Sequence, residues 1–287
     1  MKMCVHISFF YREDRLQYLK NLIDEYNDYD LKVDIFIHSN KSLDLRKLVG
    51  YSNGSLKVIK HSLFNYLLYK DRNYYLTWQP RKLMKKQVNE YDYFLYSEDD
   101  ILVPLKAFKY WLENNNICSS IDATVGFLRV ETKDGEEYLS DITSSIGSNL
   151  ELKSKKFAIN NISPYCAFWI YDKKQMSEWV NKKTYNLKYV HGLEEKNSRL
   201  LESLGLKRVN WLQYVLYNQR HKRVDTAMEM SAYGMNYPNN NNFKYTLLEL
   251  KNNKVTADCK VYHLPNNYVN EQKTLMGTLN FKNIYIN

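Results

Sequence analysis

The first hundred residues alternate between segments patterned like buried strands and segments of helical periodicity. Short apolar or period-two runs predict four strands, at residues 5–10, 31–38, 56–60 and 91–96. Apolar positions three and four residues apart predict a helix over 14–26, capped by Asp14, and another that begins at Pro80. Because strands that alternate with helices favour parallel pairing, we expect an α/β fold with a mostly parallel central sheet flanked by helices.

The second half of the chain predicts a mixture of strands and helices. The turn Lys133-Asp134-Gly135-Glu136 indicates a hairpin within residues 127–142. The other expected elements are a helix from Pro104 to near 114–116, strands at 124–130 and 165–171, helices at 175–181 and 195–204, and a loop at 233–242. This mixture predicts a second half that is less regular than the first.

The composition of the chain indicates where the protein is located in the cell and which partners it can bind. The chain has 287 residues and no apolar run near the roughly 20 residues that span a bilayer, and its first residues do not have the pattern of a signal peptide, so we expect a cytoplasmic protein. Four scattered cysteines without a CxxC spacing favour free thiols. A net charge of +9 favours anionic partners, namely phosphorylated donors, nucleic acid or a membrane surface, although a solvated face is the more common explanation of each basic cluster taken alone.

Three consecutive acids, Glu98-Asp99-Asp100, follow the predicted strand at 91–96. Neighbouring carboxylates raise the free energy needed to ionise one another, so the group needs a compensating cation. Ligands in open parallel sheets bind at the carboxyl ends of the strands, and Mg²⁺ or Mn²⁺ is typically held by one or two carboxylates together with substrate phosphates. The alternative is that these acids only favour the start of the helix after Pro104.

The segment from Tyr91 to Ile101 resembles the DxD-type segment of GT-A fold glycosyltransferases, and the order of predicted elements before it resembles their nucleotide-binding half. The resemblance covers roughly residues 3–130 and departs from the family in having EDD rather than DxD. It implies one GT-A domain over 1–287, with a nucleotide-sugar-binding half (1–103), an acceptor-binding and catalytic half (104–270) and a tail (271–287). It also implies a divalent cation, Mn²⁺ or Mg²⁺, and a nucleoside-diphosphate sugar as donor, with a UDP-sugar favoured.

The resemblance implies roles for particular residues. The metal ligands would be Asp100, Asp99 and a late histidine, His263; the alternative for this histidine is a structural role. Residues beside the donor would be Phe10, Tyr11, Arg12, His38, Ser39, Asn40, Arg81, Glu98 and Asp99. An aromatic side chain can stack on a base, and Arg12 or Arg15 can pair with phosphate, unless these arginines only pair with Glu13 and Asp14 at a helix start.

For an inverting reaction, a carboxylate must deprotonate the acceptor hydroxyl. Glu194 and Glu195 are the candidates by the resemblance, with Asp141 as a weaker one; both glutamates are also typical first-turn acids of a helix. A retaining enzyme would not need this base.

The favoured function is therefore transfer of a sugar to a hydroxyl of a glycan acceptor. The basic clusters are compatible with peripheral association with a membrane that carries a lipid-linked acceptor, and a protein-linked acceptor is the alternative. A nucleotidyltransferase would be expected to have a glycine-rich loop after the first strand, which residues 10–14 lack. A non-enzymatic glycan- or nucleic-acid-binding protein is the other alternative; no nucleic acid is expected, because the acids would repel its phosphates.

Overall fold

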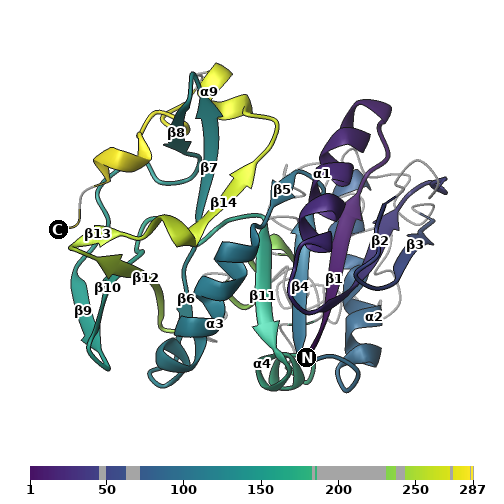
Figure 1. Ribbon diagram of the computed structural model, residues 1–287, viewed down its shortest axis with the longest axis horizontal. Helices are drawn as coiled ribbons and strands as arrows, with labels where there is room; N and C mark the ends of the chain where they lie inside the picture. The colour runs from purple at the N-terminus through teal and green to yellow at the C-terminus, as the bar shows by residue number, and fades with distance from the viewer. Residues whose placement is uncertain are drawn as a thin grey trace, which may run out of the picture.

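A computed structural model describes residues 1–44, 50–62, 72–182, 185, 231–236, 243–271, 274–284 and 286. A five-stranded sheet forms the centre, in the order β11-β4-β1-β2-β3 (Figure 1). Its strands are β1 (Lys2–Phe9), β2 (Lys32–Ser39), β3 (Leu56–Lys60), β4 (Tyr93–Glu98) and β11 (Phe168–Asp172). The first four are parallel, and β11 pairs antiparallel with β4. The prediction of a mostly parallel central sheet is confirmed.

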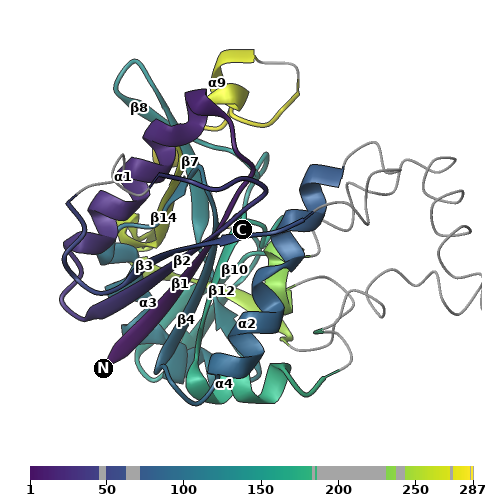
Figure 2. The same cartoon turned by 90° about the vertical axis from the view of Figure 1, so that its right-hand side faces the viewer.

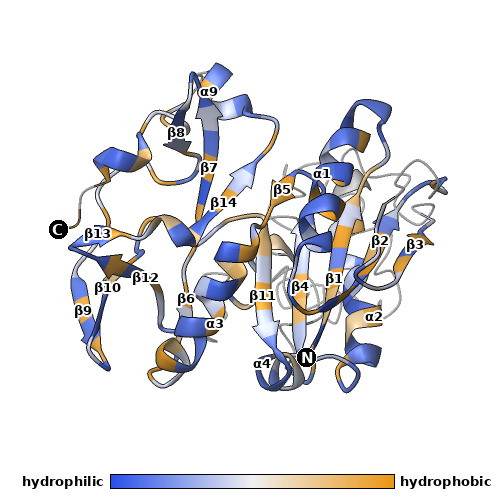
Figure 3. Ribbon diagram, viewed as in Figure 1, coloured by the Kyte–Doolittle hydropathy of each residue, from blue (hydrophilic) through white to orange (hydrophobic). Residues whose placement is uncertain are grey.

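Helices cover both faces of this sheet (Figure 2). The helices α1 (Leu16–Asn27) and α3 (Leu105–Ser119) share a core with the apolar β1 side chains Val5 and Ile7. On the opposite face, α2 (Pro80–Gln87) and α4 (Lys173–Trp179) pack on the aromatic side chains of β4 and β11. Because β1 is covered on both sides, it is a nearly continuous run of buried residues, as is typical of a parallel strand. Figure 3 shows hydrophobic residues along this strand.

Two smaller sheets complete the described fold. One has the order β5-β14-β7-β8 and consists of Ile101–Leu102, Lys260–His263, Leu128–Lys133 and Glu136–Leu139. The other has the order β13-β12-β10-β9, with β6 beside β12, and consists of Lys254–Val255, Tyr245–Lys251, Lys155–Ile159, Asn149–Leu152 and Ala123–Val125. The expected hairpin is confirmed as β7 and β8.

The remaining described elements are short. The helix α9 covers Asn267–Glu271, and the 3₁₀ turns cover Glu13–Arg15, Arg72–Trp78, Gly234–Asn236, Ala257–Cys259 and Phe281–Asn283. No described helix combines the length and the apolar character needed to cross a bilayer.

Three sequence predictions were wrong in extent. The strand expected at 124–130 is divided into β6 and β7, because its two parts pair in different sheets, with β12 and with β14. Between them the chain passes so close to β12 that a Cβ at Gly126 would lie 2.9 Å from Thr246 Cγ2. The helix α3 continues through Asn114 and Asn115, whose buried side chains find partners in Glu249 and Asp172. Asp14 is not the cap of α1, which begins only at Leu16 after a 3₁₀ turn.

Other expectations lie largely outside the described residues. The helix predicted at 195–204 does so completely. Of the loop predicted at 233–242, the described part is helical at its start, with the 3₁₀ turn Gly234–Asn236. The proposed division of the chain at residues 103 and 270 stays a prediction.

Candidate functional site

The order of the central sheet identifies the edge where a ligand is expected. The chain leaves β1 towards β2 and β3 on one side, whereas β4 lies on the other side of β1. The carboxyl ends of β1 and β4 therefore flank a topological switch point, and open α/β sheets bind ligands in the crevice outside such a point. Ser8 and Glu98 are register partners there, so the three acids follow directly at this edge.

Arg15 is hydrogen-bonded to two of the three acids. We call Glu98, Asp99, Asp100 and Arg15 together the acid cluster. The Arg15 guanidinium donates two hydrogen bonds to Asp99, at 2.6 and 2.9 Å, and one to Asp100 Oδ2 at 2.7 Å. The Asp99 and Asp100 side chains are only 7% and 10% exposed, and that of Arg15 is 23% exposed. Asp100 Oδ1 is buried and has no hydrogen-bond partner within the described chain.

His263 approaches the acid cluster from the small sheet. Its Nε2 lies 3.6 Å from Asp100 Oδ2, and its Nδ1 is hydrogen-bonded to Glu131. The carboxylate of Glu131 is fully buried and also accepts a hydrogen bond from the Val269 amide at 2.8 Å. The ring of Tyr268 packs against His263, with centroids 5.5 Å apart.

Burial and mutual repulsion set the pKa values in this region. Burial, followed by the charges of Asp100 and Asp99, raises the pKa of Glu98 well above its usual range. Burial also acts to raise the pKa of Asp100, but the hydrogen bond and charge of His263, together with Arg15, outweigh it and lower that pKa. Burial and the charge of Asp100 also raise the pKa of Asp99, against the hydrogen bonds from Arg15. The acid cluster thus favours an ionised Asp100 beside His263 and a proton, or another cation, near Glu98.

A second buried ion pair lies beside the first. Arg129 donates two hydrogen bonds of 2.7 Å to Asp141, and both side chains are less than a tenth exposed. The Arg129 guanidinium lies over the rings of Tyr165 and Tyr268, at 5.1 and 5.3 Å from their centroids. Asp141, named above as a weaker candidate for the base, is therefore held by Arg129.

The side chains around the acid cluster have an excess of negative charge that a divalent cation could balance. Carboxyl groups outnumber the permanently cationic groups: Glu98, Asp99, Asp100, Glu131 and Asp141 are opposed by Arg15 and Arg129. The described residues contain no group of three or more His, Cys, Asp or Glu side chains arranged to hold a metal. A cation here would have Asp100, through its unpartnered Oδ1, and His263 as protein ligands. Two such ligands fit a cation that takes its other ligands from phosphate and water.

The predicted donor residues after β1 and β2 lie next to each other. The Tyr11 amide donates to Asn40 Oδ1 at 2.8 Å, which joins the two loops. Phe10 is partly exposed, whereas Ser39 is buried and accepts from the Lys41 amide. Arg12 is exposed and paired with Asp14. The alternative interpretation, an arginine paired only with a neighbouring acid at a helix start, therefore describes Arg12. It does not describe Arg15, which pairs with Asp99 and Asp100.

His38 lies inside the fold, in a row of three histidines. His6 donates through Nε2 to Gln87 Oε1 at 3.1 Å; its Nδ1 then accepts from His38 at 2.9 Å, and His38 Nδ1 accepts from His61 at 2.7 Å. His6 and His38 are fully buried. As placed, His38 has both ring nitrogens occupied and does not face a donor.

His6→Gln is expected to make the free energy of unfolding less sensitive to acid. Burial outweighs the hydrogen bond with Gln87 and lowers the pKa of His6 to about 3. A folded pKa below the unfolded value of about 6.5 stabilises the protein fully above that value, and this stabilisation is lost as the pH falls towards the folded pKa. Between about pH 7 and pH 5, the wild type should lose about 2 kcal/mol more than the variant in urea unfolding. Equal losses would contradict a neutral, buried His6.

Arg81 lies on the opposite face of the sheet from α1 and α3. Its guanidinium packs over Trp78 and Trp179, at 4.1 and 4.6 Å from the ring centroids, and donates to the Tyr185 carbonyl at 2.8 Å. It is 6% exposed. These contacts give Arg81 a place in the packing of α2 on α4 and do not bring it to the acid cluster. The two catalytic candidates, Glu194 and Glu195, lie outside the described residues.

Sequence reasoning missed Glu131 and Arg129. Both are on β7, where charged residues of opposite sign alternate with the apolar Leu128 and Val130. Such alternation is usually a solvated strand face, but here that face is buried. The signal was therefore present in the sequence, and its interpretation required the fold.

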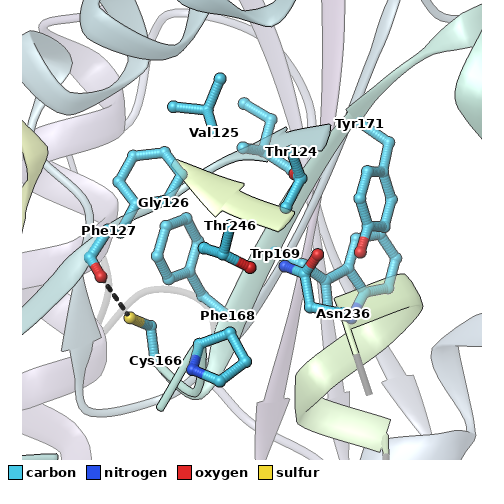
Figure 4. A pocket seen from close by; sticks show the side chains of 12 residues that line it. Thr124, Val125, Gly126, Phe127, Cys166, Phe168, Trp169, Tyr171, Asn236 and Thr246 are labelled. Atoms are coloured by element: carbon cyan, nitrogen blue, oxygen red, sulfur yellow. Dashed lines mark hydrogen bonds between the residues drawn. The ribbon is translucent and has the colours of Figure 1, made fainter. Parts of the chain in front are cut away.

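The described cavities do not include the acid cluster among their lining residues. A space of about 10 Å³ lies between β6, β11 and the start of β12 (Figure 4), where Cys166 donates to the Phe127 carbonyl at 3.4 Å. It has room for about one water molecule, far below the roughly 300 Å³ of a small-molecule site. A wider depression of about 780 Å³ lies at the amino end of β2, beside Lys32 and Ser55.

The sequence matches no protein-family model and no curated protein. Among solved structures, it is similar to residues 1–349 of S. aureus TarS, with a TM-score of 0.36 and 11% identity over 62% of this chain and 49% of that one. The complex of the same protein with UDP-GlcNAc gives a TM-score of 0.34 and 10% identity, over 62% and 47%. The chain thus spans about half the length of these structures, and at these scores the similarity carries no argument about function.

Proposed function

We propose that this protein is a glycosyltransferase that moves a sugar from a nucleoside-diphosphate sugar, with UDP-sugars favoured, to a hydroxyl of a glycan acceptor. The observation that carries the proposal is the acid cluster at the switch point between β1 and β4, with the unpartnered Asp100 Oδ1 beside His263. Such a site is suited to a ligand that brings a diphosphate and a divalent cation.

The side chains around the cluster have separate roles in this proposal. Asp100 and His263 would hold Mn²⁺ or Mg²⁺, which neutralises charge on the departing nucleotide when bound. Arg15 is the cationic group of the cluster and is more exposed than Asp99. A guanidinium can make paired hydrogen bonds to a phosphate. Phe10 and Tyr11, in the loop after β1, are the aromatic candidates for stacking on the base. Glu98 would contact the sugar or ribose.

We further propose an inverting reaction with Glu194 or Glu195 as the base. The alternative carboxylate, Asp141, is paired with Arg129 and would have to break that ion pair to accept a proton. The anomeric configuration of the product distinguishes inversion from retention. The nature of the acceptor, peripheral association with a membrane and a cytoplasmic location are parts of the proposal that rest on the sequence.

The test is calorimetric titration of UDP and of GDP, first with Mn²⁺ and then with excess EDTA. We expect one nucleotide to bind more tightly with Mn²⁺, and Asp100→Asn to weaken that binding at least tenfold, about 1.4 kcal/mol. Asp30→Asn is the matched control, because Asp30 is exposed and its partner Lys109 is on α3. Failure of both nucleotides to bind the folded wild type under either condition would overturn the donor site.

A further inference from the structure

Asp100, just before β5, lies in a row with His263 on β14 and Glu131 on β7, although the three residues are far apart in the sequence. In the small sheet, His263 is the register partner of Ile101, and the Leu264 amide donates to the Asp100 carbonyl at 2.9 Å. On the other side of β14, Tyr262 is the register partner of Val130, so Glu131 lies beside His263. The sheet therefore places Asp100, His263 and Glu131 next to one another, with the histidine in the middle.

The contacts of Glu131 fix its carboxylate at both oxygens. Oε1 accepts from His263 Nδ1, and Oε2 accepts from the Val269 amide. Tyr268, which precedes Val269, packs against the histidine ring, so the same short segment limits its rotation. Since the Nδ1 proton points at Glu131, the ring directs Nε2 towards Asp100, 3.6 Å from Oδ2.

We infer that Glu131 is a positioning residue for the cation site: it holds His263 with Nδ1 protonated, so that Nε2 faces the Asp100 carboxylate. The inference rests on the proposed function, since it assigns Glu131 a task in donor binding. A histidine ligand needs its lone pair on the nitrogen that faces the metal, and a carboxylate that accepts from the other nitrogen fixes that tautomer and the ring orientation. Loss of such a carboxylate typically weakens metal binding 10–100-fold.

The test compares Glu131→Gln with Glu137→Gln. Glu137 is the matched control because it also contacts β14, through Lys260 and Tyr262, but does not contact His263. Mn²⁺ affinity, measured by electron paramagnetic resonance in the presence of UDP, should fall about 10–100-fold in Glu131→Gln and stay near the wild-type value in the control. Glu131→Asp, which keeps the charge but shortens the reach, should lie between wild type and Glu131→Gln and serves if the glutamine variant does not fold.

A second measurement reports on the ring itself and would not change if Glu131 served only packing. In ¹⁵N spectra of metal-free protein, recorded above the His263 pKa, which Asp100 and Glu131 raise against the effect of burial, the neutral ring should carry its proton on Nδ1 in the wild type and in Glu137→Gln. In Glu131→Gln the proton should be distributed differently between the two nitrogens. Unchanged ring shifts, or equal Mn²⁺ affinity in wild type and in the folded Glu131 variants, would overturn the inference alone. A wild type that binds no Mn²⁺ with UDP present would overturn the proposed function and the inference together.

Discussion

Arg15→Met should lower the free energy of unfolding by roughly 3–5 kcal/mol, because it leaves the buried Asp99 without its cation and Asp100 with His263 alone. The arginine makes three hydrogen bonds to Asp99 and Asp100, whose side chains are at most a tenth exposed. Burial acts to lower the pKa of Arg15, yet its contacts with these two acids raise that pKa, so the guanidinium is charged at every accessible pH. Methionine keeps the length of the side chain and removes only the charge and the donors.

The measurement is urea unfolding of wild type and Arg15→Met at about pH 8 and about pH 5. The pKa of Asp99, which burial raises even beside Arg15, should rise further without the arginine, and that of Asp100 should rise as well. Stability from such groups is present at low pH and is lost as the pH rises through the folded pKa, so the deficit should be smaller at the lower pH. Arg12→Met is the control, since Arg12 and Asp14 are exposed and their pair should contribute little. Equal effects of the two substitutions would contradict a buried Arg15 ion pair.

The sequence was informative wherever local chemistry decides the structure. The period-two and apolar runs identified all four parallel strands of the central sheet, and Pro80 marked the start of α2 because proline fits the first turn of a helix. The acids were correctly expected at the carboxyl end of β4, since they follow that strand directly. Asn114 and Asn115 misled because their polarity suggested a helix end, whereas buried partners satisfy both amides.

Contacts between residues that are far apart in the sequence could not be predicted from local sequence patterns. Arg15 is 84 residues from Asp99, and Glu131 is 132 residues from His263, so each contact depends on how whole strands pair. The same limit explains Arg81, which was expected beside the donor. Its buried site is formed by Trp78 and Trp179, which meet only after α4 packs against the sheet. The metal-binding roles of Asp99, Asp100 and His263, and the catalytic roles of Glu194 and Glu195, stay predictions.

Arg129→Met is expected to have a comparable effect, roughly 3–5 kcal/mol, because it leaves Asp141 buried and unpaired. The two side chains are 4% and 9% exposed and share two hydrogen bonds of 2.7 Å. The cost should come mainly from the uncompensated carboxylate and not from lost attraction. The double variant Arg129→Met/Asp141→Leu, which removes both charges, should therefore regain most of the lost stability.

A double-mutant cycle by urea unfolding measures this coupling. If the double variant is as unstable as Arg129→Met alone, the loss comes from packing against Tyr165 and Tyr268 and not from the charge. The cycle also bears on the site, because Tyr268 connects Arg129 to His263. If the double variant recovers its stability but not its Mn²⁺-dependent UDP binding, the Arg129–Asp141 pair supports the acid cluster in a way that apolar side chains do not replace.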